Sequence, residues 1–575
     1  MPLRTSPAAA HAAFASLPVD PASRLPPKAA LAAYVDAHFG PPGSDYEAFT
    51  PPDLAAGPPP AFLPGVGDEA VRAAAVRVHA LWPALCRRPA PSSSDGGDPA
   101  PTSTLLPTPG WAVVPGDRFR ESYAWDGHWT VRGLVASGCL PTAAAVFGTL
   151  VALAAESPHG EVPNGARTYY RNRSQPPLLA PTGAALLAAG DAAARAAVLA
   201  SLPTLRAERA AWDAPHRVVR VGVSGSAGSG GVAGSHSLAR YCARWGRPRP
   251  EAYREDVDAA VAAGVLSSAD AQAGAFGDDP DHPAADLWRG LATAAESGWD
   301  FSTRWAAGGL PGGVGHGTPS PRCCAAHRVI PVDLNAFLIR SDAALAALCR
   351  AAGLEAEAAA HECAAQARRA AVDAVLWCAT TGRWRDVVLP AEAPAAGAVT
   401  TLTHAPGTYA SSWVPLWAGC GRCGAATTPP LWPAAVASLA TSGLVGPGGV
   451  ATSLAAGSGE QWDGPNAWPP LQALLADGLA DVSGWAACAA AETAGALAEE
   501  IATGFIANAL AGLAAEGTLR EKYCASTADG TPGEGGEYAT QAGFGWTNGV
   551  VLSLLRRFGW PASAARARAA GENGD

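Results

Sequence analysis

The hydrophobic and polar positions of this chain repeat mostly with the period of an α-helix. Apolar residues recur three and four positions apart over long stretches, which places them on one face of a helix. A shorter run predicts a helix at Ala29–His38, and strand-like runs are brief, such as Val218–Val223 and Ala398–Thr403. The pattern predicts long helices over Ala143–Glu156, Gly183–Trp212, Val257–Ala275, Ala284–Ser297, Asp333–Gly353, Glu355–Leu376, Leu431–Ser442, Leu471–Leu479, Trp485–Gly512 and Thr547–Phe558.

Successive helices are expected to pair as hairpins. One such hairpin is predicted in Asp342–Trp377. Leu345 and Leu348 lie on one helical face, Gly353 ends that helix, and a second periodic run follows. No repeat of fixed period is visible, which argues against a solenoid and favours an all-α toroid.

Composition divides the chain into three parts. Residues 1–60 are rich in Pro and Ala and are expected to form an N-terminal arm, residues 61–562 one helical domain, and residues 563–575 a polar tail. Inserts rich in Gly, Ser and Pro at 222–237 and 307–325 are expected to be loops on the surface of that domain.

Composition also excludes several classes of protein. The 575 residues include 40 Lys and Arg against 50 Asp and Glu, a net charge of −10, so the basic surface of a nucleic-acid-binding protein is not expected. A hydrophobic share of 49% excludes a disordered chain. No run reaches the roughly 18 uncharged apolar residues that span a bilayer, so no membrane span is predicted. The N-terminal run is a poor signal peptide, and a cytoplasmic location is expected. Oligomeric state does not follow from the sequence.

Two local motifs are weak evidence for a cofactor or metal. The glycines of the 222–237 insert do not stand between a strand and an apolar helix start, as a nucleotide-binding loop requires. Cys420 and Cys423 form a CxxC pair, but no second pair or His partner follows at the spacing of a zinc site. We therefore predict no metal and no cofactor.

Six clusters combine Trp or Tyr with Arg, amides and carboxylates between the predicted helices. A single Trp-Asp pair is usually a packed indole beside a helix cap, and a single Arg-Pro pair is usually a solvated loop. A sugar, however, needs flat apolar surfaces for its C–H faces and planar polar groups for its hydroxyls. Six such clusters together therefore favour a sugar-binding site. They lie at 115–126, 163–176, 247–251, 296–305, 460–470 and 521–549.

Two of these clusters resemble signatures of the trehalases, the inverting glycoside hydrolases of family 37. Residues 115–128 are similar to Pro-Gly-Gly-Arg-Phe-x-Glu-x-Tyr-x-Trp-Asp-x-Tyr, with Asp117 in place of the second Gly and His128 in place of the last Tyr. Residues 461–470 match Gln-Trp-Asp-x-Pro-x-Ala-Trp-x-Pro in full. Further stretches resemble the family in the same order: 173–177, 297–301, 330–335 and 521–548. The resemblance covers about residues 80–560 and implies an (α/α)6 toroid as the catalytic domain over 61–562.

The resemblance also implies roles for individual residues. Asp300 falls at the family's general acid and Glu521 at its general base. We expect His128 to change one wall of a sugar subsite. The residues alone leave Asp126, Asp463 and Glu537 open as alternatives to Asp300. The positions implied to contact the disaccharide are Arg118, Trp125, Asp126, Asn164, Arg173, Ser174, Gln175, Arg249, Pro250, Glu251, Gly298 and Glu537.

The activity that the resemblance implies is hydrolysis of α,α-trehalose to two glucose molecules, with inversion at the anomeric carbon. Asp300 stands between Trp299 and Phe301, so we expect desolvation to raise its pKa and keep it protonated. Glu521 stands beside Lys522, which favours an ionised base. The alternatives are a toroid glycosidase acting on another α-glucoside, an inactive sugar-binding sensor, and a helical scaffold for protein partners.

Overall fold

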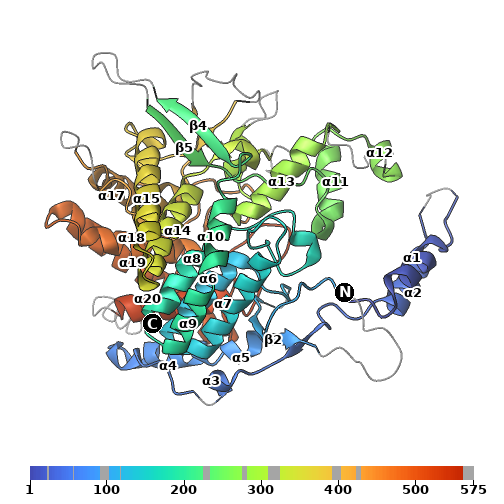
Figure 1. Cartoon of the computed structure of the whole chain (residues 1–575), viewed down its shortest axis with the longest axis horizontal. Coiled ribbons are helices and arrows are strands. Elements are labelled where there is room, and N and C mark those ends of the chain that lie inside the picture. Colours follow the sequence, from blue (N-terminus) through green and yellow to red (C-terminus); the bar gives the residue numbers. More distant parts are fainter. Residues whose placement is uncertain are drawn as a thin grey trace.

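A closed ring of helices forms the centre of the molecule. The computed structural model describes residues 1–21, 25–55, 57–90, 103–116, 118–223, 234–274, 281–308, 324–390, 403–422 and 429–560. In these residues each helix of the ring packs against the next and the last packs against the first (Figure 1). The ring consists of α6 (Ala124–Ala136), α8 (Leu179–Ala188), α14 (Val332–Ala351), α16 (Val414–Trp417), α18 (Pro469–Ser483) and α20 (Gly545–Phe558).

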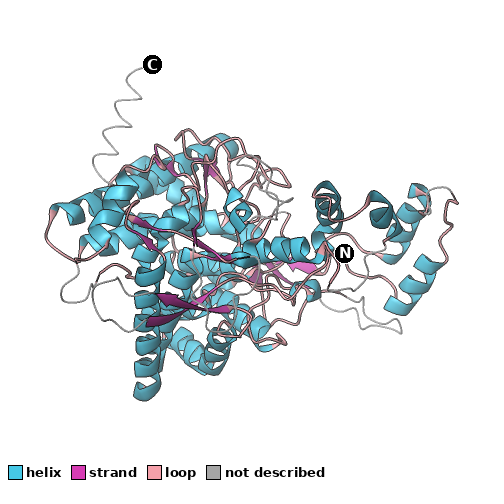
Figure 2. Cartoon of the chain, turned by 90° about the horizontal axis from the view of Figure 1, so that it is seen from above, coloured by secondary structure: helices cyan, strands magenta, loops and turns pink. Residues whose placement is uncertain are grey.

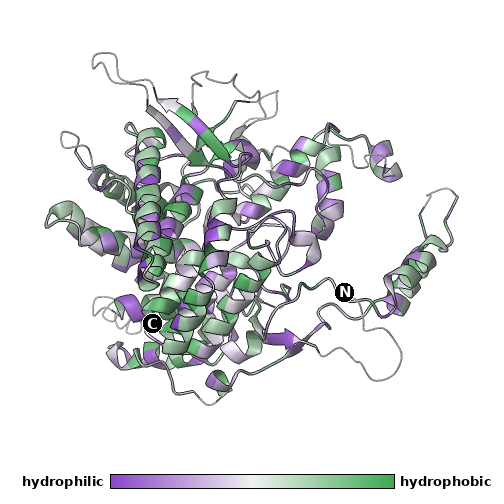
Figure 3. Cartoon of the chain, viewed as in Figure 1, coloured by the Kyte–Doolittle hydropathy of each residue, from purple (hydrophilic) through white to green (hydrophobic). Residues whose placement is uncertain are grey.

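A second layer of helices surrounds the ring and confirms the predicted (α/α)6 toroid. The outer helices pack on ring helices, except that α17 packs on α19. Figure 2 shows how far helices outweigh strands in the molecule. Figure 3 shows that α7 is mostly apolar, as expected for a helix packed between neighbours. The outer layer consists of α4 (Glu69–His79), α7 (Leu140–Ala155), α9 (Ala192–Ala200), α10 (Leu202–Ala211), α15 (Glu355–Val375), α17 (Trp432–Ala440) and α19 (Ala489–Glu516).

Smaller helices flank this double ring. The first pair, α1 and α2, stands to one side of the body in Figure 1. Helices α11 and α13 pack on each other beside the ring. These helices are α1 (Pro7–Ala15), α2 (Lys28–His38), α3 (Pro52–Ala55), α5 (Trp82–Leu85), α11 (Tyr253–Ala262), α12 (Ser268–Ala273) and α13 (Ala285–Ser297).

Strands are short and lie in small antiparallel sheets. β4 (Val218–Val223) is the predicted strand, and it pairs with β5 (Gly234–Ala239). The expected strand at Ala398–Thr403 lies outside the described residues except for Thr403, which begins β10. The other strands are β1 (Tyr46–Ala48), β2 (Cys86–Pro89), β3 (Ala112–Val113), β6 (Val329–Ile330), β7 (Trp377–Cys378), β8 (Arg383–Trp384), β9 (Val387–Val388), β10 (Thr403–His404), β11 (Val445–Gly446), β12 (Gly449–Val450), β13 (Asn466–Ala467) and β14 (Tyr523–Cys524).

Glycines decide where several predicted helices end. The hairpin of α14 and α15 turns at Gly353, whose φ of 77° is unfavourable for other residues. The single helix predicted over Gly183–Trp212 is instead α8, α9 and α10, with a break at Gly190, whose φ is 79°. Val257–Ala275 divides in the same way at Gly264.

Helix α6 was not predicted, and its position corrects the interpretation of the first cluster. Trp125 and Asp126 lie in its first turn rather than between helices. The helix has no apolar stripe because nearly all of its residues are buried on every side. At Gly133 it meets α20 so closely that a Cβ would lie 2.2 Å from the Cα of Gly549.

Helix α19 is the one described helix that is long and apolar enough to cross a membrane. In its most apolar window, 61% of the residues are buried inside the protein. Because it packs on α18 and α20 of the ring, its apolar residues are accounted for by the core.

A buried arginine joins the ring to the loop that follows α13. Arg304 is fully buried and binds Asp333 of α14 at 2.7 Å (Nη1–Oδ2) and Asp386 at 2.6 Å (Nε–Oδ2). Asp386 also accepts a hydrogen bond of 2.9 Å from the amide of Val332, the first residue of α14. This network therefore fixes the start of a ring helix relative to the segment 298–304.

Replacing this arginine should destabilise the fold. In Arg304→Met, two buried carboxylates lose their counter-charge, and breaking a buried pair costs about 3–5 kcal/mol. Chemical denaturation monitored by circular dichroism measures the loss. The matched control is Arg254→Met, since Arg254 pairs with Asp258 on the surface and should lose less than about 1 kcal/mol. An equal, small loss in both variants would contradict this view of the network.

Candidate active site

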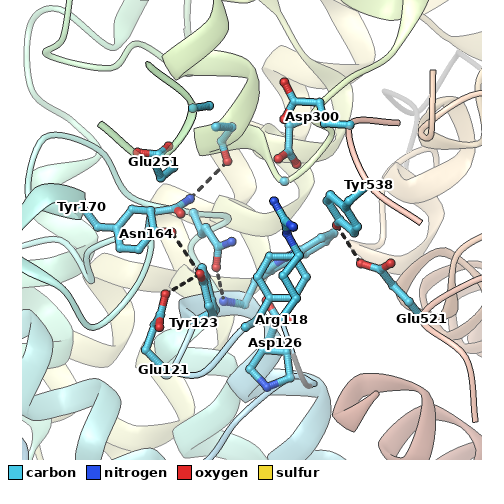
Figure 4. A pocket seen from close by; sticks show the side chains of 18 of the residues that line it. Arg118, Glu121, Tyr123, Asp126, Asn164, Tyr170, Glu251, Asp300, Glu521 and Tyr538 are labelled. Atoms are coloured by element: carbon cyan, nitrogen blue, oxygen red, sulfur yellow. Dashed lines mark hydrogen bonds between the residues drawn. The ribbon is translucent and has the colours of Figure 1, made fainter. Parts of the chain in front are cut away.

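A pocket of about 400 Å³ opens at the N-terminal ends of the ring helices. Trp125 and Asp126 reach it from the first turn of α6, and Trp546 from the first turn of α20. Trp468 reaches it from the N-cap position of α18. The N-terminal end of a helix carries partial positive charge and favours negatively charged groups. The ring thus directs aromatic and polar side chains into one concave space (Figure 4).

The structure brings most of the predicted residues together in this pocket. Both Asp300 and Glu521 line it. Ser174 and Pro250 do not. The predicted contact residues that line it are Arg118, Trp125, Asp126, Asn164, Arg173, Gln175, Arg249, Glu251, Gly298 and Glu537.

The two exceptions support the pocket from behind. The Ser174 amide donates a 3.0 Å hydrogen bond to Glu296 Oε1, and its hydroxyl donates to the carbonyl of Val162 at 2.6 Å. Pro250 is exposed and begins the 3-10 turn Pro250–Ala252, which carries Glu251. Both therefore position neighbours that face the pocket.

Several further residues that had no predicted role also line the pocket. All but Ala252 and Ala295 belong to the clusters of aromatic and polar residues, so their composition already marked them. The sequence did not show which members of each cluster face the pocket. These lining residues are Pro115, Phe119, Glu121, Tyr123, Tyr169, Tyr170, Ala252, Ala295, Gln461, Trp462, Trp468, Tyr538, Phe544 and Trp546.

Stacked indoles form one wall. Trp462 lies parallel to Trp468, with ring centroids 4.0 Å apart, and stacks on Trp299 at 5.2 Å. Trp125 and Trp546 meet edge to face at 5.8 Å. The stack leaves Trp462 and Trp468 only 1% exposed each, so it forms a rigid apolar backing to the pocket.

Asp300 is held through its backbone, and no described residue forms an ion pair with it. It follows Gly298, which ends α13 with φ of 75° and at which a Cβ would lie 2.8 Å from the Trp125 indole. The Asp300 carbonyl accepts a hydrogen bond from the side-chain amide of Gln461. Burial raises the pKa of the Asp300 carboxyl to about 7, with Glu537 adding to the rise and Arg249 opposing it.

Glu521 lies in a more polar setting. The Tyr538 hydroxyl donates a 2.9 Å hydrogen bond to its Oε1 (Figure 4). The backbone amide of Gln541 donates to its Oε2 at 3.3 Å. Trp546 Nε1 binds the Glu521 carbonyl at 2.9 Å. Burial raises the pKa of Glu521, but the Lys522 ammonium and these hydrogen bonds oppose the rise.

The other carboxyl candidates differ in position. Asp126 lines the pocket, and burial raises its pKa to about 8, with Glu521 and Asp300 adding to the rise. Glu537 also lines the pocket, and burial raises its pKa.

Asp463 does not line the pocket. Instead Asp463 accepts hydrogen bonds from Ser302, Thr303, Ser453 and Ser458. It is therefore a structural link between two loops.

Two of the pocket arginines are oriented by carboxylates, and a third lies against a tyrosine ring. Arg249 binds Asp256 through Nη2 at 2.7 Å and lies 3.6 Å from Glu537. Arg173 binds Glu251 at 2.5 Å. Arg118 lies over the Tyr538 ring, with its Cζ 4.9 Å from the centroid. Each guanidinium is thereby held in place before a ligand arrives.

A chain of contacts connects the pocket wall with the N-terminal segment. Arg167 Nη1 binds Asp45 Oδ2 at 2.9 Å, and its Nε binds Glu121 Oε2 at 2.9 Å. Glu121 Oε1 accepts a 2.7 Å hydrogen bond from the Tyr123 hydroxyl, which lies 2.9 Å from that of Tyr170. Residue 45 directly precedes β1, which pairs with β2, so this part of the arm packs on the body.

The sequence departs from the family signature at Asp117 and His128. Asp117 lies outside the described residues. The expectation for His128 is wrong, because His128 points into the ring, where its Nδ1 lies 2.9 Å from Thr182 Oγ1 of α8. It does not line the pocket. Among the described residues, no group of three His, Cys, Asp or Glu could hold a metal ion.

Comparison with known proteins agrees with this geometry. A family model described as "Trehalase" matches residues 1–559. A probable trehalase of Oryza sativa subsp. japonica is 37% identical over 559 residues, covering 96% of this chain and 90% of the relative. The trehalase of Homo sapiens is 33% identical over 563 residues, covering 97% and 85%.

Among solved structures, the neutral trehalase of Saccharomyces cerevisiae superposes with a TM-score of 0.57. It is 19% identical, and the match covers 80% of this chain and 75% of that one. This likeness shows a shared toroid fold. The family match, the two relatives and the signatures around the pocket together place this chain in the trehalase family.

Proposed function

We propose that this protein hydrolyses α,α-trehalose to two glucose molecules, with inversion at the anomeric carbon. The observation that carries the proposal is that Asp300 and Glu521 line one pocket with stacked indoles and oriented arginines, in a chain of the trehalase family. Its relatives from Oryza sativa and Homo sapiens bear the name trehalase.

Asp300 suits the role of general acid. A pKa of about 7 leaves a large fraction of the carboxyl protonated near neutral pH, so it can donate a proton to the glycosidic oxygen. The group leaves as neutral glucose, and Asp300 is left ionised. Arg249 and Arg173, whose charges favour the ionised form, then stabilise this product state.

Glu521 suits the role of general base. Its hydrogen bonds from Tyr538 and Gln541 fix the carboxylate and favour its ionised form. The base takes a proton from water while the water oxygen bonds to the anomeric carbon and the glycosidic C–O bond breaks. An inverting site needs about 6.5–9.5 Å between the two carboxyls to admit this water. The cycle closes when solvent returns a proton to Asp300 and removes one from Glu521.

The remaining lining residues suit the binding of two pyranose rings. Indoles line the cavity as its apolar part, and Arg118, Arg173 and Arg249 offer planar donors to hydroxyl oxygens. A cavity of about 400 Å³ falls in the range of small-molecule sites.

Product stereochemistry tests the proposal directly. Polarimetry or NMR during trehalose hydrolysis should show α- and β-glucose appearing in equal amounts, because one anomeric centre inverts and the other keeps its configuration. Asp300→Asn and Glu521→Gln should each lower kcat by about 10²–10⁴-fold. Asp258→Asn, on the exposed surface of α11, is the matched control and should be unchanged.

Other outcomes point to other functions. Exclusive formation of α-glucose would contradict inversion. Faster hydrolysis of another α-glucoside would change the substrate. Binding of trehalose by the parent protein without turnover would support a sensor, and absence of any sugar-dependent thermal shift would support a scaffold.

The pKa values predict a bell-shaped dependence of kcat/KM on pH. Activity should fall as pH rises through about 7, because Asp300 loses the proton that it must donate. It should fall on the acid side at a pH above the ordinary Glu value of 4.5, because the base must be ionised and burial raises the pKa of Glu521.

The variant Asp126→Asn tests whether the alkaline limb of the pH profile belongs to Asp300 or to Asp126. Since Asp126 has a pKa of about 8, a limb that belongs to Asp300 should persist near pH 7 after this change. Loss of the alkaline limb in Asp126→Asn would assign the acid to Asp126 instead.

A further inference from the structure

Residues 42–46 of the N-terminal arm lie against residues 118–123, several of which line the substrate pocket. Arg120 Nη1 donates a 2.5 Å hydrogen bond to the carbonyl of Pro42. Gly43 has φ of 77°, and a Cβ there would lie 2.5 Å from Cδ of Arg120. Strand β1 begins directly afterwards, at Tyr46, and pairs with β2. This part of the arm is therefore fixed beside the pocket.

Arg167 joins a carboxylate of the arm to a carboxylate of the pocket. Its Nη1 and Nη2 bind Asp45 Oδ2 and Oδ1 at 2.9 and 3.3 Å, and its Nε binds Glu121 Oε2 at 2.9 Å. The three side chains are only 6% to 9% exposed. Burial opposes ionisation of Asp45, but hydrogen bonds from Arg167 and Ser103 lower its pKa, so the pair is charged at neutral pH. Because both ends of the guanidinium are bound, Asp45 determines how Arg167 presents Nε to Glu121.

Glu121, Tyr123 and Tyr170 form the part of the pocket lining that we call the tyrosine wall. The Tyr123 hydroxyl donates a 2.7 Å hydrogen bond to Glu121 Oε1 and lies 2.9 Å from the Tyr170 hydroxyl (Figure 4). The two oxygens of Glu121 thus have different partners, Arg167 on one and Tyr123 on the other. A shift of Arg167 would therefore move the carboxylate and, with it, the Tyr123 hydroxyl.

The tyrosine wall also supports an arginine of the sugar site. The Cζ of Arg173 lies 5.1 Å from the centroid of the Tyr170 ring, within the range of a cation–π contact. Asp300 and Glu521 receive their hydrogen bonds from other residues. The tyrosine wall is therefore suited to holding sugar hydroxyls rather than to transferring the protons of the reaction.

We propose that Asp45 of the N-terminal arm is a positioning residue for the sugar site, acting through Arg167 and Glu121 on the hydroxyls of the tyrosine wall. This inference rests on the proposed function, because it concerns the binding of the disaccharide. Hydroxyls that are already oriented lose less freedom when a ligand binds, so the contact strengthens binding. The arm is thus part of the substrate site, although no described residue of the arm lines the pocket.

Steady-state kinetics with trehalose test this role through the split between KM and kcat. In Asp45→Asn, Arg167 loses a charged anchor, so KM should rise about five- to twentyfold while kcat changes less than about twofold. The matched control is Glu47→Gln. Glu47 stands two residues further along the arm, and its carboxylate pairs with Arg88 on the exposed surface, so its KM should equal that of the parent.

A double-mutant cycle separates positioning from a general loss of structure. Tyr123→Phe removes the hydroxyl through which Asp45 acts, so adding Asp45→Asn to it should raise KM by less than about a further twofold. Circular dichroism shows whether each variant folds. If Asp45→Asn does not fold, Asp45→Glu displaces the same charge by one methylene and should raise KM severalfold. An unchanged KM in Asp45→Glu would then count against the proposal.

Three kinetic results would overturn the proposal. One is an equal KM in Asp45→Asn and Glu47→Gln. Another is a pair of effects, from Asp45→Asn and Tyr123→Phe, that multiply in the double variant. The third is a fall in kcat at unchanged KM.

Failure of the proposed function would look different, because the parent protein itself would release no glucose from trehalose. Amide hydrogen exchange of residues 118–126 tests the link without a sugar. Exchange should be faster in Asp45→Asn than in Glu47→Gln, since only the first variant loosens the tyrosine wall. Equal exchange in the two variants would overturn the link between the arm and the wall.

Discussion

Removal of water from the Asp300 carboxyl is the constraint on which the rest of the site depends. A buried carboxyl becomes hard to ionise unless a positive charge is committed to it. Arg249, the cation that most strongly opposes the rise in the pKa of Asp300, already shares its charge with Asp256 at 2.7 Å and with Glu537 at 3.6 Å. Arg249 therefore opposes the rise in the pKa of Asp300 without cancelling it. Glu521, by contrast, has Lys522 beside it and two hydrogen-bond donors on its oxygens.

Keeping two acids in different states requires loops that do not relax. Arg304 ties the segment after Asp300 to α14, and Asp463 ties the same segment to the second signature loop. On the other side, Glu296 of α13 accepts hydrogen bonds from Arg217, Ser174 and Cys242. Burying these polar groups costs desolvation free energy. In exchange, their ion pairs and hydrogen bonds fix the positions of side chains at the ends of the ring helices.

The sequence predicted those parts of the fold that local signals determine. The hairpin of α14 and α15 was predicted because a periodic run stops at Gly353 and another begins. Helix α6 was missed because it is buried all round and has no polar face, so its Trp and Asp resembled a loop. Gly183–Trp212 divides between α8 and α9 at Gly190, whose positive φ periodicity does not report, and between α9 and α10 at Ser201.

In the site, too, local sequence predicted which residues are present but not which way their side chains point. The family resemblance selected residues that line the pocket, but Ser174 and Pro250 lie behind it, because a motif marks a neighbourhood rather than the direction of a side chain. Trp462 and Trp468 were inside a matching signature and received no role. Their contribution depends on stacking with Trp299, which is distant in sequence. His128 turned away from the pocket because α6 rotates it toward Thr182.

The protonation state of Asp300 can be measured without turnover. Infrared difference spectra of the parent protein and Asp300→Asn, recorded across a pH series, isolate the band of this protonated carboxyl. We expect the band to be present at pH 5 and to disappear with a midpoint near pH 7. A midpoint near 3.8, the ordinary value for Asp, would contradict this expectation, because it would show that burial does not hold the carboxyl in its protonated form.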